Sequence, residues 1–493
     1  MASFLGRRTS RISASIAAAL LLGAAAVLAQ PTGQQDPGDQ PDARRLPTVR
    51  VDPRVELLSI IFRLAGNPEY NQGRVPGYLE DFEKQFGRMR EHAVVQLARE
   101  LRASSGVSFD ACMSMAAHLT DPPELAPRAP FDAARSGLDA RWPRAEAQKF
   151  VELARAFVQE SAFVAFFAAH EQLYERTAER LRTTLAQEAR MNWFDRFFGA
   201  RPGARFTLAI GMLNGGSCYG ASFRAPDGQE DLYCVLGVWM VDQNDEPRFD
   251  ASVISTVVHE FCHSYTNPLI DAHAERLAPA GKALFEQVET MMRRQAYGEW
   301  KIMLYESLVR ACVARYMSAQ ATTEQMERLY ETEEQNDFLW IRGLSELLAK
   351  YEDERDKYPT LESFMPRVVE FFDQQVEETR RKVASAPRIT RMAPANGASD
   401  ADPELTAIVI EFDRPMKDGS WSVVGGGPHF PEVAGQPSYD AARRVLTWPV
   451  KLKPDWSYEF FLNSGKFQGF RAEDGAPLRP THVTFQTGAR SGG

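Results

Sequence analysis

The hydrophobic pattern of this 493-residue chain changes its period near residue 385, and this change limits the folds that the chain can adopt. From about residue 50 to residue 382, apolar residues recur mostly at helical spacing. Beyond residues 384–387 they alternate in short runs separated by Gly, Pro and Asp-Gly turn signals. The pattern predicts an α+β protein in which a mostly helical domain with a small mixed sheet precedes an all-β sandwich.

The first 48 residues have the composition of a targeting segment and a linker. Within residues 1–29, three arginines and no acid precede an apolar run and a small-residue cleavage site, which is typical of a secretory signal peptide. Residues 30–48 are polar and rich in Pro and Gly, and we expect a flexible leader. The protein is therefore expected to be exported to the periplasm, the cell surface or the extracellular medium. No later stretch reaches the ~20 apolar residues of a spanning helix, so no transmembrane span is expected in the mature form.

The charge balance argues against nucleic acid as a partner. The chain holds 57 basic and 66 acidic residues, a formal charge of −9, and it has no Lys/Arg tract. Proteins that bind nucleic acid carry a basic footprint for the phosphates.

The remaining chain divides into two predicted domains. Residues 49–383 form the first, with a helical N-terminal part over 49–200 and a part over 201–383 that contains the chemical motif described below. Residues 388–490 form the second, the sandwich.

Strand-like segments interrupt the helical pattern ahead of that motif. Residues 206–210 predict one strand, and residues 217–223 and 232–238 predict a hairpin around a Pro-Asp-Gly turn. Helices are expected again from Asp250, with breaks at Pro268, Pro279 and Gly298.

Five cysteines are too few for a disulfide scaffold in a chain of this length. If the hairpin turn centres on Pro226, Cys218 and Cys234 lie opposite each other on one face. Export permits oxidation, so a bridge between them is one of two alternatives, and free thiols are the other.

The motif with the clearest chemistry is His259-Glu260-Phe261-Cys262-His263, which has the form HExxH. Histidines four residues apart lie on one helix face, so both imidazoles can reach one Zn²⁺ at ~2.1 Å. Glu260 lies between them and can take a proton from a zinc-bound water. Two incidental helix histidines are the alternative.

A catalytic zinc needs a third protein ligand and an open position. Thr266 and Leu269 stand where a metzincin requires Gly and His, so that continuation is excluded. Among later carboxylates, Glu286 and Glu289 have the shorter spacing, but both lie near arginines and are better explained as surface charges. Glu306 is favoured.

Glu306 is a lone acid among apolar helix residues, where a carboxylate must be paired or metal-bound to offset its desolvation. An ion pair with Arg310, four residues on, is the alternative to metal binding.

Two further groups complete the predicted site. The oxyanion of a hydrolytic intermediate needs a donor, and Tyr297, beside Gly298 at a helix break, is placed ahead of Tyr305, His273 and Arg310. The hairpin just before the motif is expected to hold an extended peptide as an added strand, with substrate contacts at three consecutive residues, Tyr219, Gly220 and Ala221. Ordinary hairpin structure is the alternative for these residues.

The HExxH motif together with the Glu306 segment resembles the zincin-like metallopeptidases that have a glutamate as third ligand. That resemblance implies His259 and His263 as zinc ligands, Glu260 as base and Glu306 as third ligand. Arg310 departs from the thermolysin-like pattern, which has an Asp at that position. Residues 50–380 also resemble an uncharacterised bacterial family known as a domain of unknown function that carries HExxH, on Leu64-Ala65-Gly66-Asn67-Pro68-Glu69-Tyr70-Asn71 and the Gly-rich segment at 215–220.

The C-terminal segment resembles the bacterial immunoglobulin-like domains of cell-surface and S-layer proteins, on Pro394-Ala395-Asn396-Gly397-Ala398 and Phe412-Asp413-Arg414-Pro415-Met416. Such domains are spacers or adhesion modules, which implies a cell-surface contact.

The sequence thus predicts an exported zinc metallopeptidase that cleaves a peptide or protein substrate by Glu-assisted attack of zinc-bound water. The alternative is a non-catalytic cell-surface binding protein on a zincin scaffold with an Ig-like adhesion or spacer domain.

Overall fold

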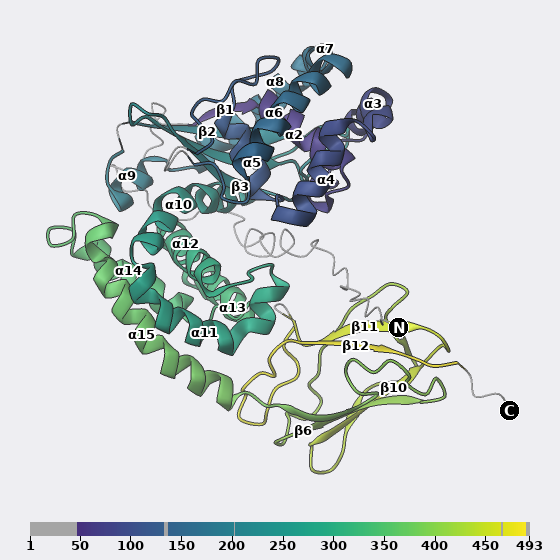
Figure 1. Ribbon diagram of the computed structural model, residues 1–493. Coiled ribbons are helices and arrows are strands. Elements are labelled where there is room, and N and C mark those ends of the chain that lie inside the picture. Colours follow the sequence, from purple (N-terminus) through teal and green to yellow (C-terminus); the bar gives the residue numbers. More distant parts are fainter. Residues whose placement is uncertain (1–46, 133–136, 202, 465–466, 490–493) are drawn as a thin grey trace, which may run out of the picture. The chain divides into compact units, whose positions relative to one another are not determined.

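The computed structural model describes residues 47–132, 137–201, 203–464 and 467–489, so the predicted signal peptide and nearly all of the predicted leader lie outside the described residues. The described chain is α+β, as predicted (Figure 1). It divides into two compact units. The first contains the described residues up to 278, with 293–329 and 343–369; the second contains 279–292, 330–342 and the described residues from 370 onward.

Helices dominate the chain up to residue 385. They are α2 (Pro53–Leu64), α3 (Pro76–Phe86), α4 (Ala93–Ser105), α5 (Asp110–His118), α6 (Arg144–Glu160), α7 (Phe163–Ala169), α8 (Glu171–Glu188), α9 (Asn192–Phe198), α10 (Ser252–Ala272), α11 (Ala274–Arg294), α12 (Trp300–Ser318), α13 (Thr323–Gln335), α14 (Ile341–Asp353) and α15 (Leu361–Ser385), with short 3₁₀ turns η2 (Pro68–Tyr70) and η3 (Gly87–Met89). No helix in the described ranges is long and apolar enough to cross a membrane.

The first unit contains a mixed four-stranded sheet, as predicted. Its strands are β1 (Thr48–Val51), β2 (Ala204–Gly211), β3 (Tyr219–Arg224) and β4 (Glu230–Gly237), in the order β1-β2-β4-β3. β1, β2 and β4 are parallel, and β3 is the antiparallel edge strand that forms the predicted hairpin with β4. β4 is buried along nearly its whole length because α10 and α5 both pack against it. The sheet edge at β3 therefore lies directly beside α10.

The predicted helix breaks at Pro268 and Pro279 are wrong, whereas Gly298 does lie between α11 and α12. Proline at 268 has no N–H to donate to the carbonyl of Ser264, which usually ends or kinks a helix. The Arg201 Nη1 donates to that carbonyl instead, over 3.2 Å. This contact replaces the missing hydrogen bond, so α10 continues to Ala272.

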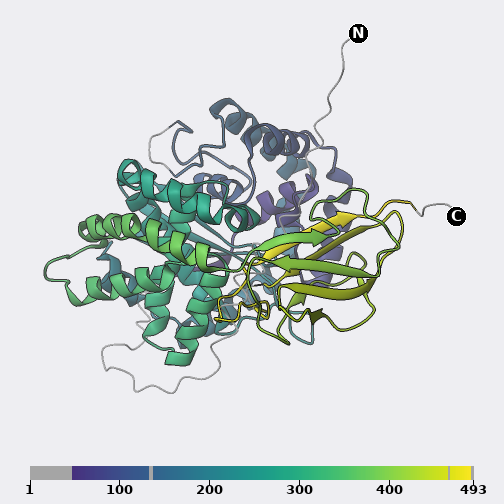
Figure 2. The ribbon, with the colours of Figure 1, turned by 90° about the horizontal axis from the view of Figure 1, so that it is seen from below.

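The second unit contains the predicted β-sandwich. One sheet has the order β5-β6-β10-β8, with β9 also paired to β10, and the other has the order β12-β11-β7. Figure 2 shows these strands in green to yellow. Their bounds are β5 (Ile389–Ala393), β6 (Ala407–Phe412), β7 (Val423–Val424), β8 (Glu432–Val433), β9 (Ser438–Tyr439), β10 (Val445–Lys451), β11 (Ser457–Leu462) and β12 (Thr481–Gln486). Alternate residues of both sheets fill one apolar core, including Ile410, Trp448 and Phe460.

The sandwich is joined to helical segments of its own unit by a partly buried ion pair. Arg479, just before β12, pairs with the carboxylate of Asp337, and its Nη1 donates to the carbonyl of Gln287 over 3.0 Å. Burial raises the pKa of Asp337, and the charge of Arg479 opposes that shift. The change of periodicity near residue 385 therefore does not coincide with the boundary of this compact unit.

A buried carboxylate in α2 fixes the end of β2. Glu56 is fully buried and accepts hydrogen bonds from the Tyr78 hydroxyl and the Met212 N–H, each over 2.6 Å. Burial raises the pKa of Glu56 to about 7, although both hydrogen bonds oppose this shift. The folded protein therefore holds this proton more tightly than the unfolded chain does.

We expect Glu56→Gln to change the pH dependence of stability. In the native protein Glu56 should lower the free energy of unfolding by about 3 kcal/mol as the pH rises from about 4.5 to 7, because over this range the folded state still binds a proton that the unfolded chain has released. The glutamine variant should lack this contribution. Urea unfolding at several pH values, with the exposed Glu80→Gln as control, measures it; equal pH slopes in the native and Glu56→Gln proteins would refute the assignment.

Candidate metal centre

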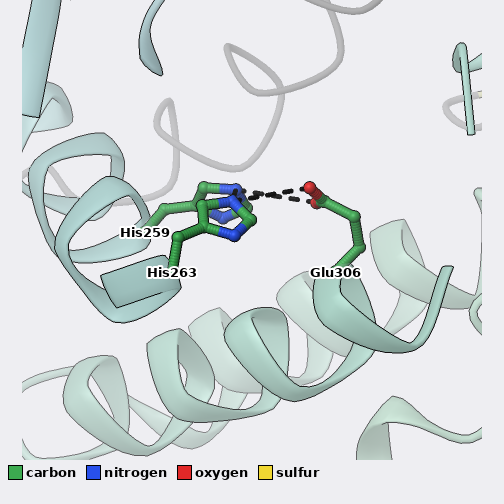
Figure 3. A group of neighbouring side chains, drawn as sticks. All are labelled: His259, His263 and Glu306. Carbon is green, nitrogen blue, oxygen red and sulfur yellow. Dashed lines mark hydrogen bonds and ion pairs between the residues drawn. The ribbon is translucent and has the colours of Figure 1, made fainter. Parts of the chain in front are cut away.

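Two helices bring the predicted ligands together. His259 and His263 project from α10, and Glu306 projects toward them from α12 (Figure 3). The two imidazole Nε2 atoms are 3.2 Å apart. The Glu306 Oε2 is 3.6 Å from Nε2 of His259, and its Oε1 is 3.5 Å from Nε2 of His263. Among the described residues, this is the one group of three or more His, Cys, Asp or Glu side chains that could hold a metal ion.

These distances fit a tetrahedral metal site. Donor atoms at ~2.1 Å from a tetrahedral Zn²⁺ lie about 3.4 Å from one another, close to the 3.2, 3.5 and 3.6 Å found between the three side chains. Two imidazoles and a carboxylate are also the donor set of many hydrolytic zinc sites, in which the fourth position stays open. The residues therefore fit a divalent cation such as Zn²⁺.

His263 is oriented by the next turn of its own helix. Its Nδ1 lies 3.2 Å from the side-chain oxygen of Asn267, four residues on. Because an amide oxygen only accepts, Nδ1 carries the proton and the lone pair of Nε2 points toward His259 and Glu306. Asn267 was not predicted from the sequence, although its i+4 spacing from His263 is a signal that could have identified it.

Burial lowers the pKa of His259 to about 3, although the charge of Glu306 opposes that shift. The side chain of His259 is 7 % exposed, and that of His263 is 19 % exposed. His259 is therefore neutral at physiological pH, the form that binds metal ions.

Glu306 is held by two neighbours. The Tyr297 hydroxyl donates to its Oε2 over 3.1 Å, and the Nε of Arg310 lies 3.5 Å from the same oxygen. Arg310 also donates to the Tyr297 hydroxyl over 3.1 Å. Burial alone would raise the pKa of Glu306, but the two neighbouring imidazoles, the charge of Arg310 and the hydrogen bond from Tyr297 hold it below its usual range. The predicted ion pair with Arg310 thus exists beside the three-residue group, not in place of it.

Two of the other oxyanion candidates make different contacts. The Tyr305 hydroxyl donates to the Asp271 carboxylate, and His273 forms the C-cap of α10. Of the four candidates considered, Tyr297 and Arg310 are the two whose polar groups contact Glu306.

Glu260 lies in the same helical turn and outside the ligand group. It is buried, and burial raises its pKa to about 7, although His263 and a backbone hydrogen bond from Gly220 oppose the shift. Its own carbonyl oxygen would lie 2.6 Å from a Cβ at position 220, so only glycine lets β3 approach α10 this closely. Because position 220 has no side chain, β3 contacts α10 directly at Glu260.

The hairpin pairing decides which backbone groups of β3 point away from β4. Ala225 N–H donates to the Gln229 carbonyl, which makes these two residues a hydrogen-bonded pair. Such pairs alternate along an antiparallel ladder, and Gly220 faces Cys234 in the alternate class. The N–H and C=O of Gly220 therefore point away from β4, whereas those of Tyr219 and Ala221 point toward it.

The predicted bridge between Cys218 and Cys234 is wrong, because both thiols are free. Cys234 pairs with Gly220, two positions beyond Cys218. The turn holds a left-handed glycine at 228 and is centred on Asp227, so the register differs from the one expected for a turn at Pro226.

Two solved structures are remotely similar to this chain. The S-layer protein rSbsC(31-844) has a TM-score of 0.15 and 12 % identity, and the surface layer protein SbsC, domains 1-6, has a TM-score of 0.17 and 14 % identity. Each match covers 51 % of this chain and 35 % of the other, so the chain spans about a third of the length of these proteins. TM-scores this low carry no argument about fold or function.

No curated protein matches the chain. One family model does, over residues 47–371, and that span includes both helices of the candidate metal centre. The matched segment is well over half of the chain. The protein therefore belongs to the DUF4932 family, which is described as a domain of unknown function.

Proposed function

We propose that this protein is a zinc-dependent hydrolase, and specifically a metallopeptidase of the glutamate-zincin type. The observation that carries the proposal is the convergence of His259, His263 and Glu306 at tetrahedral spacing, with Glu260 beside them and outside the ligand group. A purely structural metal site does not require a general base such as Glu260.

The chain's own groups divide the work of hydrolysis. Zn²⁺, when bound, lowers the pKa of a water molecule toward ~7 and polarises a carbonyl. Asn267 holds His263 with Nε2 free to bind, and Tyr297 and Arg310 hold the carboxylate of Glu306. Glu260 accepts the proton of the attacking water and delivers it to the leaving amine.

Tyr297 has a positioning role in this arrangement. Its hydroxyl is committed to Glu306, with Arg310 donating to the same oxygen. To act as the predicted oxyanion donor, the Tyr297 hydroxyl would have to give up its hydrogen bond to Glu306 and point toward the substrate.

The substrate in this proposal is an extended peptide segment beside β3. The outward C=O of Gly220 is the group that an added strand would meet next to Glu260, because the outward N–H of Gly220 donates to the Glu260 carboxylate. Tyr219 and Ala221 flank this position, and their backbone groups serve the pairing with β4. The substrate contact is therefore expected at Gly220 rather than equally at all three residues.

The proposal includes export, on the signal-peptide pattern of residues 1–29, and a spacer or surface-contact role for the Ig-like region at 388–490, on the resemblance described above. A surface-binding protein without turnover remains the competing function. The two functions can be distinguished by experiment, because a surface-binding protein would not hydrolyse peptides even with metal bound.

The proposal predicts zinc-dependent peptide hydrolysis. Purified protein should cleave casein or members of a peptide library, lose that activity with 1,10-phenanthroline and regain it on addition of Zn²⁺. The non-chelating 1,7-isomer is the matched control and should have no effect. A protein that binds one zinc per chain but cleaves no peptide would support the surface-binding alternative.

A further inference from the structure

The sandwich has a hollow on the outer face of the sheet that contains β11 and β12. Its volume is about 420 Å³, within the range of ~300–1,000 Å³ that is usual for small-molecule sites. Ser457 and Glu459 of β11 line it, and so do Gln486 and Thr484, their partners on β12. These positions face outward because the residues between them, such as Tyr458, belong to the apolar core. The hollow is open to solvent, since three of the four residues are exposed.

Hydrogen bonds already engage backbone groups on both sides of the hollow. On the β11 side, the Glu459 N–H donates to the His429 carbonyl, and the Nδ1 of His429 donates to the Ser457 carbonyl, each over 2.9 Å. On the β12 side, the backbone of residues 484–486 pairs with that of residues 397–398 over 2.6 and 2.7 Å. An extended peptide therefore finds no free strand edge to join at these described residues.

The side chains that line the hollow are mostly small and neutral, and they surround one carboxylate. The hydroxyls of Ser457 and Thr484 and the amide of Gln486 make no hydrogen bond to any residue that the structure describes. Hydroxyl and amide groups both donate and accept, as the hydroxyls of a sugar do. No Lys or Arg is among the lining residues, so no permanently positive side chain attracts an anionic ligand there.

The carboxylate of Glu459 is held in place by the neighbouring strand. Its Oε1 accepts a hydrogen bond from Nε2 of His482 over 2.9 Å. The imidazole of His482 is in turn stacked on Phe461, with ring centroids 4.5 Å apart and an interplanar angle of 17°. The second oxygen of Glu459 can accept from a ligand hydroxyl. Because the carboxylate is already oriented, less side-chain freedom is lost on binding.

An aromatic pair lies beside β11 at the hollow. The ring of His429, a lining residue, stacks on the indole of Trp456 with centroids 5.6 Å apart and an angle of 21°. The Trp456 Nε1 donates to the carbonyl of Pro428 over 2.9 Å, which fixes the indole. Since Nδ1 of His429 is used by the Ser457 carbonyl, its Nε2 is the ring nitrogen left for a ligand.

We propose that this hollow binds a neutral saccharide unit of a polysaccharide. The sugar hydroxyls hydrogen-bond to Glu459, Thr484 and Gln486, and the imidazole of His429 contacts the sugar ring. The side chains supply the hydrogen bonds because the nearby backbone groups are already paired. The sandwich thereby has a binding function of its own, and this proposal is independent of the proposed hydrolysis.

The test is affinity electrophoresis of the full chain in native gels that each contain one polysaccharide. The neutral probes are a β-glucan, a mannan and a xylan, and the anionic probe is polygalacturonate. We expect retardation by at least one neutral polysaccharide, reversed by the matching soluble oligosaccharide, and none by the polyanion. Retardation by no neutral polysaccharide, or by polygalacturonate alone, would overturn the proposal.

Variants of the lining residues test whether the hollow is the site. Glu459→Ala should raise the dissociation constant for the retained polysaccharide by ~10-fold or more, because it removes a charged hydrogen-bond acceptor. Gln486→Ala, at an exposed position, should also weaken binding and decides the question if the first variant fails to fold.

Glu432→Ala is the matched control. Glu432 is likewise an exposed strand carboxylate with a cationic partner, Lys451, but it lies on the other sheet of the sandwich. This variant should bind as the native chain does. Melting temperatures verify that each variant is folded. Undiminished binding by both folded hollow variants, or equal losses in the control, would show that the polysaccharide binds elsewhere.

Discussion

Replacing His263 with alanine is expected to abolish stoichiometric zinc binding. The substitution removes one of three donors that lie within bonding geometry of a single site. Loss of an outer-shell partner alone typically costs ~10–100-fold in metal affinity, and loss of a ligand should exceed that range. Elemental analysis of the purified protein, with competition against a chromophoric chelator, measures the effect. Full occupancy in the His263→Ala protein would remove the site from consideration.

Carboxylate variants serve as matched controls for this experiment. Glu306→Gln should lose most of the bound metal, whereas the exposed Glu286→Gln should retain it. Tyr297→Phe removes the hydroxyl that donates to Glu306 and should weaken binding ~10–100-fold without abolishing it. Metal loss in Glu286→Gln with full retention in Glu306→Gln would show that the third ligand is wrongly assigned.

Replacing Glu260 with glutamine is expected to separate metal binding from turnover. The amide keeps nearly the same shape and lies outside the ligand group, so the metal content should stay near that of the native protein. It cannot accept a proton from water, and a general base typically contributes ~10²–10⁴-fold to the rate. The kcat for a peptide substrate should therefore fall by about that factor.

A measurement of kcat and KM together with metal content tests this expectation. Glu275→Gln, an exposed position at the start of α11, should leave all three quantities unchanged. Unaltered hydrolysis by the Glu260→Gln protein would eliminate the base from the mechanism, and with it the case for a metallopeptidase.

The parts of the site that the sequence predicted depend on local spacing. His259 and His263 share a helix face because of the α-helical period. Glu306 could be singled out because an isolated acid in an apolar helix needs partners, and in the structure it contacts the two histidines, Arg310 and Tyr297. The period of the hydrophobic pattern likewise predicted the mixed sheet, the hairpin and the sandwich.

The parts that the sequence did not predict depend on contacts between distant segments. The register of the hairpin follows the geometry of its turn, and a difference of one position in the turn centre displaced Cys218 from Cys234. The compact second unit gathers residues 279–292 and 330–342 with the sandwich, and Arg479 links them through Asp337. Such contacts between segments far apart in the sequence cannot be predicted from a local sequence pattern.

The continuation of α10 through Pro268 makes the HExxH motif dependent on a distant residue. Asn267, which orients His263, lies in the turn that the proline would otherwise disrupt, and Arg201 supplies the hydrogen bond that the proline cannot make. A peptide of residues 252–272 would thus contain both histidines without the means to hold that turn. Grafting the five-residue motif onto another helix would transfer two ligands but leave the tautomer of His263 unspecified.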